Sequence, residues 1–293
     1  MAGTVARLTK TPLQNRAGLR DPLWLRILLI SLALLFIAVM LALPLVLVFR
    51  YAFREGIRVY LEAFTDEDAL SAIWLTLGTT LVAVPFSALF GLTAAWAITK
   101  FNFRGKNLLI TFIDLPFAVS PVVAGLVFMI LFGNRGYLGP WLQEQGLRIV
   151  FNTPGLILVT MFVTFPFVAR ELIPLMQTQG TEEEYAALSL GANGFQTFFT
   201  VTLPNVKWAL FYGLILCNAR AMGEFGASSV VSGNIRGLTN TLPLHIEALY
   251  NDHRITASFA MASLLACLAV LTLILKSFIE WRASHNQIEN TES

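Results

Sequence analysis

Long apolar runs separated by short polar stretches dominate the pattern of this chain. Stretches such as Ile27–Phe49 and Ile255–Leu275 contain no Asp, Glu, Lys or Arg. A helix needs about 20 apolar residues to cross the hydrocarbon core of a membrane. Because no water inside a bilayer can satisfy open backbone groups, we expect the apolar segments to be helical. The pattern predicts an all-α polytopic membrane protein with six transmembrane helices, at about 24–49, 71–99, 108–132, 153–176, 207–232 and 256–279.

Composition supports the membrane interpretation. The chain has 293 residues, of which 56% are hydrophobic and 13% are charged, whereas soluble domains carry about 25% charged residues. Its two cysteines, Cys217 and Cys267, both fall in apolar segments. We expect them to be buried thiols that pack as small hydrophobic groups.

Basic residues precede the first apolar run, among them Arg7, Lys10, Arg16 and Arg20. A secretory signal has a shorter apolar core of about 7–15 residues, so we expect the first span to be retained. This divides the chain into three regions: a cytoplasmic N-terminal segment 1–23, a six-span transmembrane domain 24–282 and a cytoplasmic tail 283–293.

The distribution of positive charge predicts the orientation. With six spans, both termini, the 100–107 loop and the 177–206 segment lie on one side, and most Lys and Arg residues lie there too. Positively charged loops favour the cytoplasmic side. Both termini and the 177–206 segment are therefore predicted to be cytoplasmic.

The 181–204 segment is the longest moderately polar stretch between the spans. Thr181 followed by Glu184 has the spacing of a helix capping box, and Gly191 and Gly194 permit a sharp turn. We expect two short helices here, ended by Pro204, with an apolar stripe formed by Phe195, Phe198, Phe199 and Val201. Such a stripe favours a protein partner, although an amphipathic helix lying on the membrane surface is an alternative.

Two charges lie inside the fifth predicted span. Arg220 and Glu224 are four residues apart, so they can face each other along one helix. Charges at membrane depth usually point to a protein interior or a water-filled cavity. The pair is either a structural link or part of a pathway for an anion. For Asp114 we expect a place at the membrane interface, and for Arg170 and Glu171 a structural role.

The sequence shows no motif for a metal site or for nucleotide binding. His245, His253 and His285 are scattered without ligand spacing, and Gly105-Lys106 lacks the upstream glycine of a phosphate-binding loop. We therefore expect no metal site, no cofactor and no hydrolysis of ATP by this chain itself.

The 181–204 segment resembles the EAA loop of bacterial ABC-importer permeases, the element that contacts a separate ATPase. The residues in register with that loop are Ala186, Ala187, Gly191, Val201, Leu203 and Pro204. The chain departs from the pattern at Tyr185, where the family has Glu, and Glu184 stands one place earlier.

Further stretches resemble the oxyanion branch of these permeases, and in combination the sulfate/thiosulfate permeases. They are Phe101–Gly105, Asp114–Gly125, Phe165–Glu171, Asn218–Ala227 and Ser232–Leu244. Molybdate permeases share part of the Asn218–Ala227 stretch. The resemblance extends from about residue 24 to 282.

The resemblance implies a permease subunit of the bacterial inner membrane. Its expected partners are a second permease subunit, two ATP-binding subunits that carry ATP and Mg²⁺, and an extracytoplasmic binding protein for sulfate or thiosulfate. A dianion needs polar groups along its route, and the candidate lining residues are Arg220, Glu224, Ser120, Thr164, Asn218, Ser228 and Ser229. Alternatives are the same machinery for molybdate or another oxyanion, and an ATP-independent secondary transporter or channel.

Overall fold

The computed structural model describes the backbone of residues 22–292 and the side chains as far as residue 278. Every regular element within this range is a helix, which confirms the all-α prediction. The basic residues Arg7, Lys10, Arg16 and Arg20 of the predicted cytoplasmic segment lie outside the described residues. The chain divides into two compact units, Met1–Leu47 and Val48–Ser293, and each is described by itself.

The first unit contains helix α1 (Leu23–Ile37), the π-helical turn η1 (Ala38–Ala42) and the start of helix α2 (Leu43–Ala52). The widened turn ends two residues before Pro44. A proline has no backbone N–H and its ring clashes with the carbonyl four residues earlier. The π-helical turn makes room for that ring, so the apolar helix continues past the proline.

The second unit holds the remaining helices. Their bounds are α3 (Ile57–Glu62), α4 (Glu67–Lys100), α5 (Lys106–Ala118), α6 (Pro121–Phe132), α7 (Gly139–Glu144), α8 (Thr153–Gln179), α9 (Glu182–Ser189), α10 (Gly194–Thr197), the π-helical turn η2 (Phe198–Thr202), α11 (Leu203–Met222), α12 (Gly226–Ser232), α13 (Leu242–Asn251) and α14 (Ile255–Glu292).

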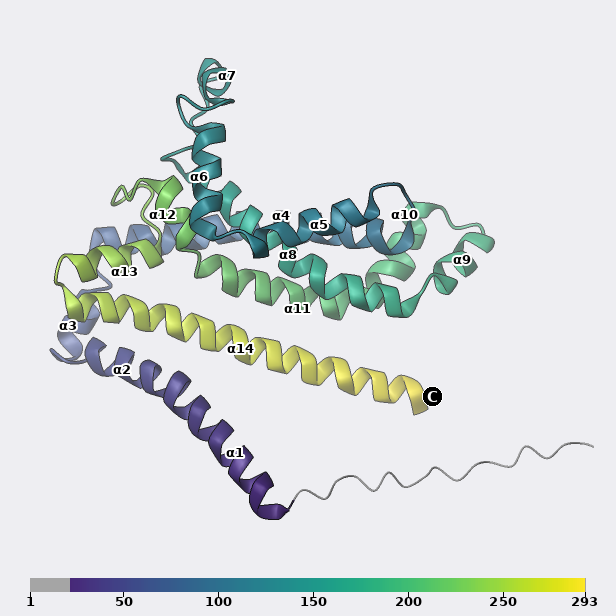
Figure 1. The fold of residues 1–293 in the computed structure, drawn as a ribbon, viewed down its shortest axis with the longest axis horizontal. Coiled ribbons are helices and arrows are strands. Elements are labelled where there is room, and N and C mark those ends of the chain that lie inside the picture. Colours follow the sequence, from purple (N-terminus) through teal and green to yellow (C-terminus); the bar gives the residue numbers. More distant parts are fainter. Residues whose placement is uncertain (1–21, 293) are drawn as a thin grey trace, which may run out of the picture. The chain divides into compact units, whose positions relative to one another are not determined.

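Three long helices, α4, α8 and α11, pack against one another and form the centre of this unit (Figure 1). Small residues allow their backbones to approach closely. A Cβ atom on Gly91 of α4 would lie 2.7 Å from Val168 Cβ of α8, and one on Gly213 of α11 would lie 3.2 Å from Val168 Cα. A hydrogen bond of 3.1 Å between Ser87 and Thr164 joins α4 to α8 in the buried interior.

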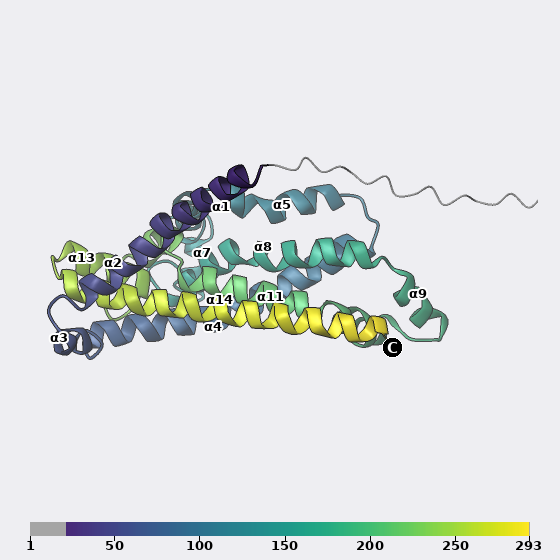
Figure 2. The same ribbon diagram turned by 90° about the horizontal axis from the view of Figure 1, so that it is seen from below.

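Helix α14 packs along α11 and α13 (Figure 2). No Gly or Pro interrupts residues 255–292, and accordingly the predicted sixth span and the predicted tail 283–293 form one continuous helix to Glu292. Cys217 is buried in the central core, as predicted, but Cys267 is exposed. The expectation of two buried thiols is therefore wrong for Cys267, which is exposed on α14.

Within the described residues, five helical segments are long and apolar enough to cross a membrane, or six if one bent pair counts as a single span. The bent pair is α5 and α6, whose axes differ by 110°, so the predicted span 108–132 consists of two helices and not one. The chain leaves the helical conformation at Val119, and Pro121 disfavours a helical conformation at Ser120, so the helix restarts at Pro121 in a new direction. Figure 1 shows α6 turning away from α5 and leading to α7.

The predicted fifth span 207–232 also differs. Its helix begins earlier, because α10, η2 and α11 form one continuous segment from Gly194 to Met222. It ends earlier too, since residues 223–225 interrupt it before the short helix α12. Pro204 does not end an element: η2 ends two residues before it, as η1 does before Pro44, and the helix continues.

Candidate functional site

The predicted docking segment 181–204 follows α8 and lies at one end of the long helices, with α9 at its tip (Figure 1). The chain leaves α8 at Gly180, with φ of 71°, and forms α9. It then turns at Gly191, with φ of 92°, and enters α10. A positive φ is strained for residues with a Cβ, so these two turns need glycine. The two short helices and the turn between them agree with the prediction.

The predicted capping box at Thr181 and Glu184 is wrong. Thr181 precedes α9, but its side chain makes no capping hydrogen bond. The capping box lies at the next helix, where the side chains of Asn193 and Gln196 and the backbone N–H groups of the same residues form two reciprocal bonds of 2.8 Å. The Glu184 carboxylate is instead engaged by other elements of the chain.

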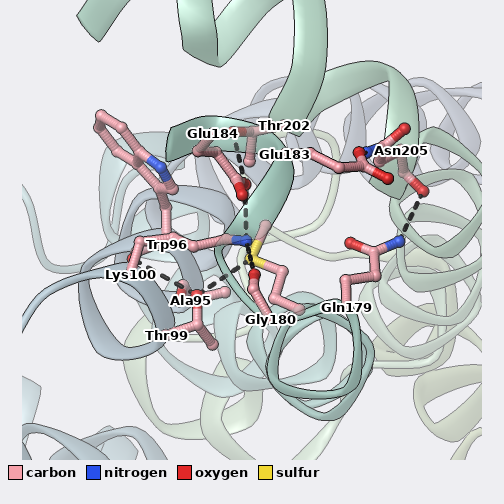
Figure 3. A network of polar contacts seen from close by, with 11 residues as sticks. Ala95, Trp96, Thr99, Lys100, Gln179, Gly180, Glu183, Glu184, Thr202 and Asn205 are labelled. Atoms are coloured by element: carbon pink, nitrogen blue, oxygen red, sulfur yellow. Dashed lines mark hydrogen bonds and ion pairs between the residues drawn. The ribbon is translucent and has the colours of Figure 1, made fainter. Parts of the chain in front are cut away.

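Figure 3 shows what holds Glu184. The Nζ atom of Lys100, the last residue of α4, lies 2.6 Å from Glu184 Oε1, and the side chains are only 7% and 15% exposed, respectively. The hydroxyl of Thr202 donates to the same carboxylate oxygen at 3.1 Å. Lys100 also donates a hydrogen bond to the carbonyl of Gly180. One lysine thus joins the ends of α4 and α8 to α9.

A second polar contact holds the neighbouring residue. Asn205, in the first turn of α11, donates a hydrogen bond to Glu183. The backbone carbonyl of Asn205 accepts a hydrogen bond of 3.2 Å from Gln179. These contacts connect α8, α9 and α11 beside the Lys100 network (Figure 3).

Beside these polar contacts, much of the surface of this segment is apolar and exposed. The residues most exposed there are Tyr185 (64%), Leu190 (89%), Phe195 (81%) and Phe199 (58%). Ala186 is also exposed, whereas Ala187, Val201 and Leu203 are half-buried. Phe198 is half-buried as well and lies 4.9 Å from the ring of Trp96. The predicted apolar stripe is therefore split, with Phe195 and Phe199 facing outward and Phe198 and Val201 turned toward the chain.

A cavity of about 320 Å³ lies between the end of α4 and this segment. Trp96 and Phe101 line it from the α4 side, and Tyr185, Leu188 and Thr202 line it from the other. Lys100 and Glu184 also line it. The segment therefore rests on α4 through a polar pair with open space beside it.

The two charges of the fifth predicted span form an ion pair. Arg220 Nη1 lies 2.6 Å from Glu224 Oε2, and the side chains are 31% and 1% exposed. The other carboxylate oxygen of Glu224 accepts a hydrogen bond of 2.9 Å from the backbone N–H of Ala227. Glu224 thus links the end of α11 to the start of α12 across the interruption.

Two helix interruptions meet beside this pair. A Cβ atom on Gly226, the first residue of α12, would lie 3.0 Å from Pro121 Cβ, the first residue of α6. A Cβ atom on Gly125 would lie 2.8 Å from the carbonyl oxygen of Ala227. The interruption between α5 and α6 and the one between α11 and α12 are therefore in contact, although they are distant in sequence.

The other candidate lining residues are less closely grouped. Ser120 is exposed at the α5–α6 bend and Ser228 is buried in α12. Asn218 is half-buried one turn before the α11–α12 interruption, and its side-chain amide makes a weak contact of 3.8 Å with Met222 Sδ. Ser229 bonds to the backbone of its own helix, and Thr164 bonds to Ser87 and to the backbone of α8.

Asp114 and Arg170 form an ion pair between α5 and α8, with two contacts of 2.8 and 2.9 Å to one carboxylate oxygen. The guanidinium group also lies 4.2 Å from the centre of the Phe117 ring. These contacts give Arg170 the structural role expected for it. Among the described residues there is no group of three His, Cys, Asp or Glu side chains that could hold a metal ion.

Sequence reasoning missed Lys100 as a site residue. The available signal was a single lysine at the end of the 34-residue α4, followed by the short 100–107 loop. Nothing in the local pattern indicates that its partner is Glu184.

Comparison with known proteins adds to this geometry. The family model "Binding-protein-dependent transport system inner membrane component" matches residues 87–285. The sulfate transport system permease protein CysW of Escherichia coli K12 is 51% identical over 264 residues, which cover 90% of this chain and 91% of that protein. CysW of Synechocystis is 46% identical, covering 89% and 94%.

A solved structure has a similar fold. It is the crystal structure of a bacterial ABC transporter involved in the import of the acidic polysaccharide alginate, with a TM-score of 0.73 and 17% sequence identity. The match covers 89% of this chain and 96% of that chain.

Proposed function

The chain belongs to the family of inner membrane components of binding-protein-dependent transport systems, and from this we propose that it is the membrane-spanning subunit of an ATP-driven importer that carries sulfate or thiosulfate into the cytoplasm. The observation that carries the proposal is the 51% identity to a sulfate permease over 91% of its length.

The exposed face of α9 and α10 supports the docking of a separate ATPase subunit. It presents Tyr185, Leu190 and Phe195 to the surroundings, and an apolar surface of this kind is stable in the cytoplasm only when a partner covers it. The sequence has no phosphate-binding loop of its own. We assign the face to an ATP-binding subunit, on which ATP and Mg²⁺ are bound; no cofactor is assigned to this chain.

The remaining partners follow from the same assignment. A second, similar permease subunit forms the other half of the pathway, two ATP-binding subunits dock on the cytoplasmic side, and an extracytoplasmic binding protein delivers the anion. The chain lies in the bacterial inner membrane with both termini in the cytoplasm. This places α9 on the side where ATP is available.

We place the pathway for the anion at the contact between the two helix interruptions. A dianion is stabilised by positive charge and by free backbone N–H groups at the starts of helices. Arg220 supplies the charge and is 31% exposed beside the interruption, while Ser120 is exposed at the start of α6. Glu224, almost fully buried, balances Arg220 so that the anion is attracted without being held permanently.

ATP can drive transport only if the nucleotide-bound ATPase pair favours one arrangement of the spans over the other. Closure of the ATPase pair displaces α9, and the displacement reaches the interrupted helices through α8 and α11. The interruptions allow short segments such as α6 and α12 to move while the central helices stay packed. The site then opens toward one side of the membrane at a time.

Uptake by the complete complex in proteoliposomes tests the proposal. Labelled sulfate should accumulate only with ATP and the loaded binding protein, and unlabelled thiosulfate should compete. Uptake that molybdate blocks and sulfate does not would assign the cargo to another oxyanion. Uptake that proceeds without ATP would assign the chain to the secondary transporters or channels and overturn the proposal.

A further inference from the structure

The link between α9 and the rest of the chain is polar. Among the described residues of α9 none is buried, so little hydrophobic packing fixes this helix. Glu184, Ala187 and the preceding Thr181 are half-buried and mark the side of α9 that faces the chain. The attachment depends mainly on Glu184 and Glu183, the two side chains of α9 with bonds to other elements.

Glu184 is bonded within its own chain. Its Oε1 atom receives both the Lys100 ammonium group, at 2.6 Å, and the Thr202 hydroxyl, at 3.1 Å. With only 15% of its side chain exposed, it is poorly placed to bind a second protein. Tyr185, the next residue, is 64% exposed. Consecutive helical residues point about 100° apart, so Glu184 reaches Lys100 while Tyr185 borders the open cavity beside the pair and keeps most of its surface exposed.

Lys100 is the last residue of α4, and α4 packs along α8 in the central core. A largely buried ion pair resists separation, because pulling it apart leaves two unpaired charges away from water. The pair therefore ties a movement of α9 to the end of α4 more firmly than an exposed pair would.

We propose that Lys100 and Glu184 are positioning residues that transmit the displacement of α9 directly to α4, and that Tyr185, not Glu184, is the residue of this pair that contacts the ATP-binding subunit. This inference rests on the proposed docking of that subunit at α9. It assigns to α4 a direct part in the transport cycle, beside the covalent route through α8 and α11.

The test uses the complete reconstituted complex and the variants Lys100→Met and Glu184→Gln. Each removes one charge at similar side-chain size. The ATP-binding subunit should stay bound and hydrolyse ATP, while the number of sulfate ions imported per ATP falls about tenfold, within the range of coupling between sites in proteins. Lys100→Arg keeps the charge and should retain most of the coupling.

Matched controls separate this effect from a general loss of charge. Glu182→Gln alters an exposed carboxylate on the same helix, and Arg104→Gln alters an exposed cation four residues after Lys100. Both should import sulfate at the wild-type ratio. The double variant Lys100→Met/Glu184→Met leaves no unpaired charge, so its thermal stability should return toward wild type while its import ratio stays low.

Several outcomes would overturn the inference. They are wild-type coupling in both single variants, recovery of coupling together with stability in the double Met variant, or loss of the ATP-binding subunit from the single variants. If the wild-type complex itself binds no ATP-binding subunit, the proposed function fails instead. The wild-type measurement therefore distinguishes the two failures.

Discussion

Arg220 illustrates how one residue can be structural and functional together. It pairs with the almost fully buried Glu224 and is itself one-third exposed at the meeting point of two helix interruptions. Removing it leaves a carboxylate without its counter-charge. Loss of Arg220 should therefore lower both the stability of the protein and its transport activity.

We expect Arg220→Ala to lower stability by about 2 kcal/mol, less than the 3–5 kcal/mol of fully buried pairs because Arg220 is 31% exposed. Sulfate uptake should fall further than in Lys207→Ala, since Lys207 is exposed. Thermal unfolding in detergent and uptake in proteoliposomes measure the two effects. Equal uptake by both variants would remove Arg220 from the pathway.

His245 is a residue whose titration should be visible in stability. It lies in α13, outside the candidate spans, with 3% of its surface exposed. Burial lowers the pKa of its imidazole, and the charges of Arg236 and Arg254 lower it further, whereas Asp66 and Asp68 oppose the shift. The folded protein thus binds this proton less readily than the unfolded chain does.

The neutral form of His245 contributes stability at high pH, and this contribution is lost as the pH falls below about 6.5, the ordinary histidine pKa. We expect the unfolding temperature to drop from about pH 7.5 to about pH 5.5, and to drop less in His245→Gln. His253→Asn, at an exposed position, is the control. An unchanged pH dependence in His245→Gln would contradict the prediction.

Close helix packing is the feature that matters at the scale of the elements. Helices α4 and α8 approach each other at Gly91, where a side chain would meet Val168. Gly78, on the same helix, has no atom within 4 Å of an added Cβ. A larger side chain therefore fits at Gly78 but not at Gly91.

Gly91→Leu should destabilise the protein by about 1–3 kcal/mol, the usual range for overpacking a core. Gly78→Leu should leave the unfolding temperature close to that of the wild type. Both are measured by thermal unfolding in the same detergent. A similar loss in the two variants would mean that leucine acts through something other than the α4–α8 contact.

The turn between α9 and α10 belongs to the same scale. Gly191 has φ of 92°, whereas Gly194 has an ordinary backbone, and neither has atoms close to an added Cβ. A β-branched residue is strained at positive φ. Gly191→Val should therefore change the angle between the helices without a clash.

In the purified complex, Gly191→Val should retain less of the ATP-binding subunit than Gly194→Val. A changed angle between α9 and α10 alters the shape of the surface that the two helices present to that subunit. Quantitative co-purification measures the difference. If the two variants retain the subunit equally, the angle at Gly191 does not matter for docking.

At the scale of the whole molecule, orientation in the membrane decides whether α9 can meet an ATPase. Single cysteines test it in a background with Cys217→Ser and Cys267→Ser. Arg104→Cys, in the loop after α4, should react with an impermeant maleimide only after spheroplasts are opened. Arg135→Cys, between α6 and α7, should react while they are intact. The reverse pattern would place α9 outside the cytoplasm.

Much of the architecture could be predicted from the sequence. Hydropathy indicated the apolar segments that the structure forms as long helices, because the cost of placing polar groups in hydrocarbon acts on each stretch of chain separately. Glycine spacing likewise indicated the turn at Gly191, since positive φ is a property of one residue. The ion pair of Arg220 and Glu224 was predictable because a spacing of four residues brings two side chains together, although Glu224 lies just beyond the end of α11.

The tertiary structure alone decided which distant residues meet. The 110° bend at Pro121 and the interruption after Met222 were each placed inside a single predicted span, because proline and glycine often stay within membrane helices when neighbouring helices satisfy the freed backbone groups. Whether they break a helix depends on what packs beside them, here Pro121 against Gly226. Glu184 was expected to cap its own helix and instead bonds Lys100, since an ion pair between separate helices depends on how they pack and not on the local sequence.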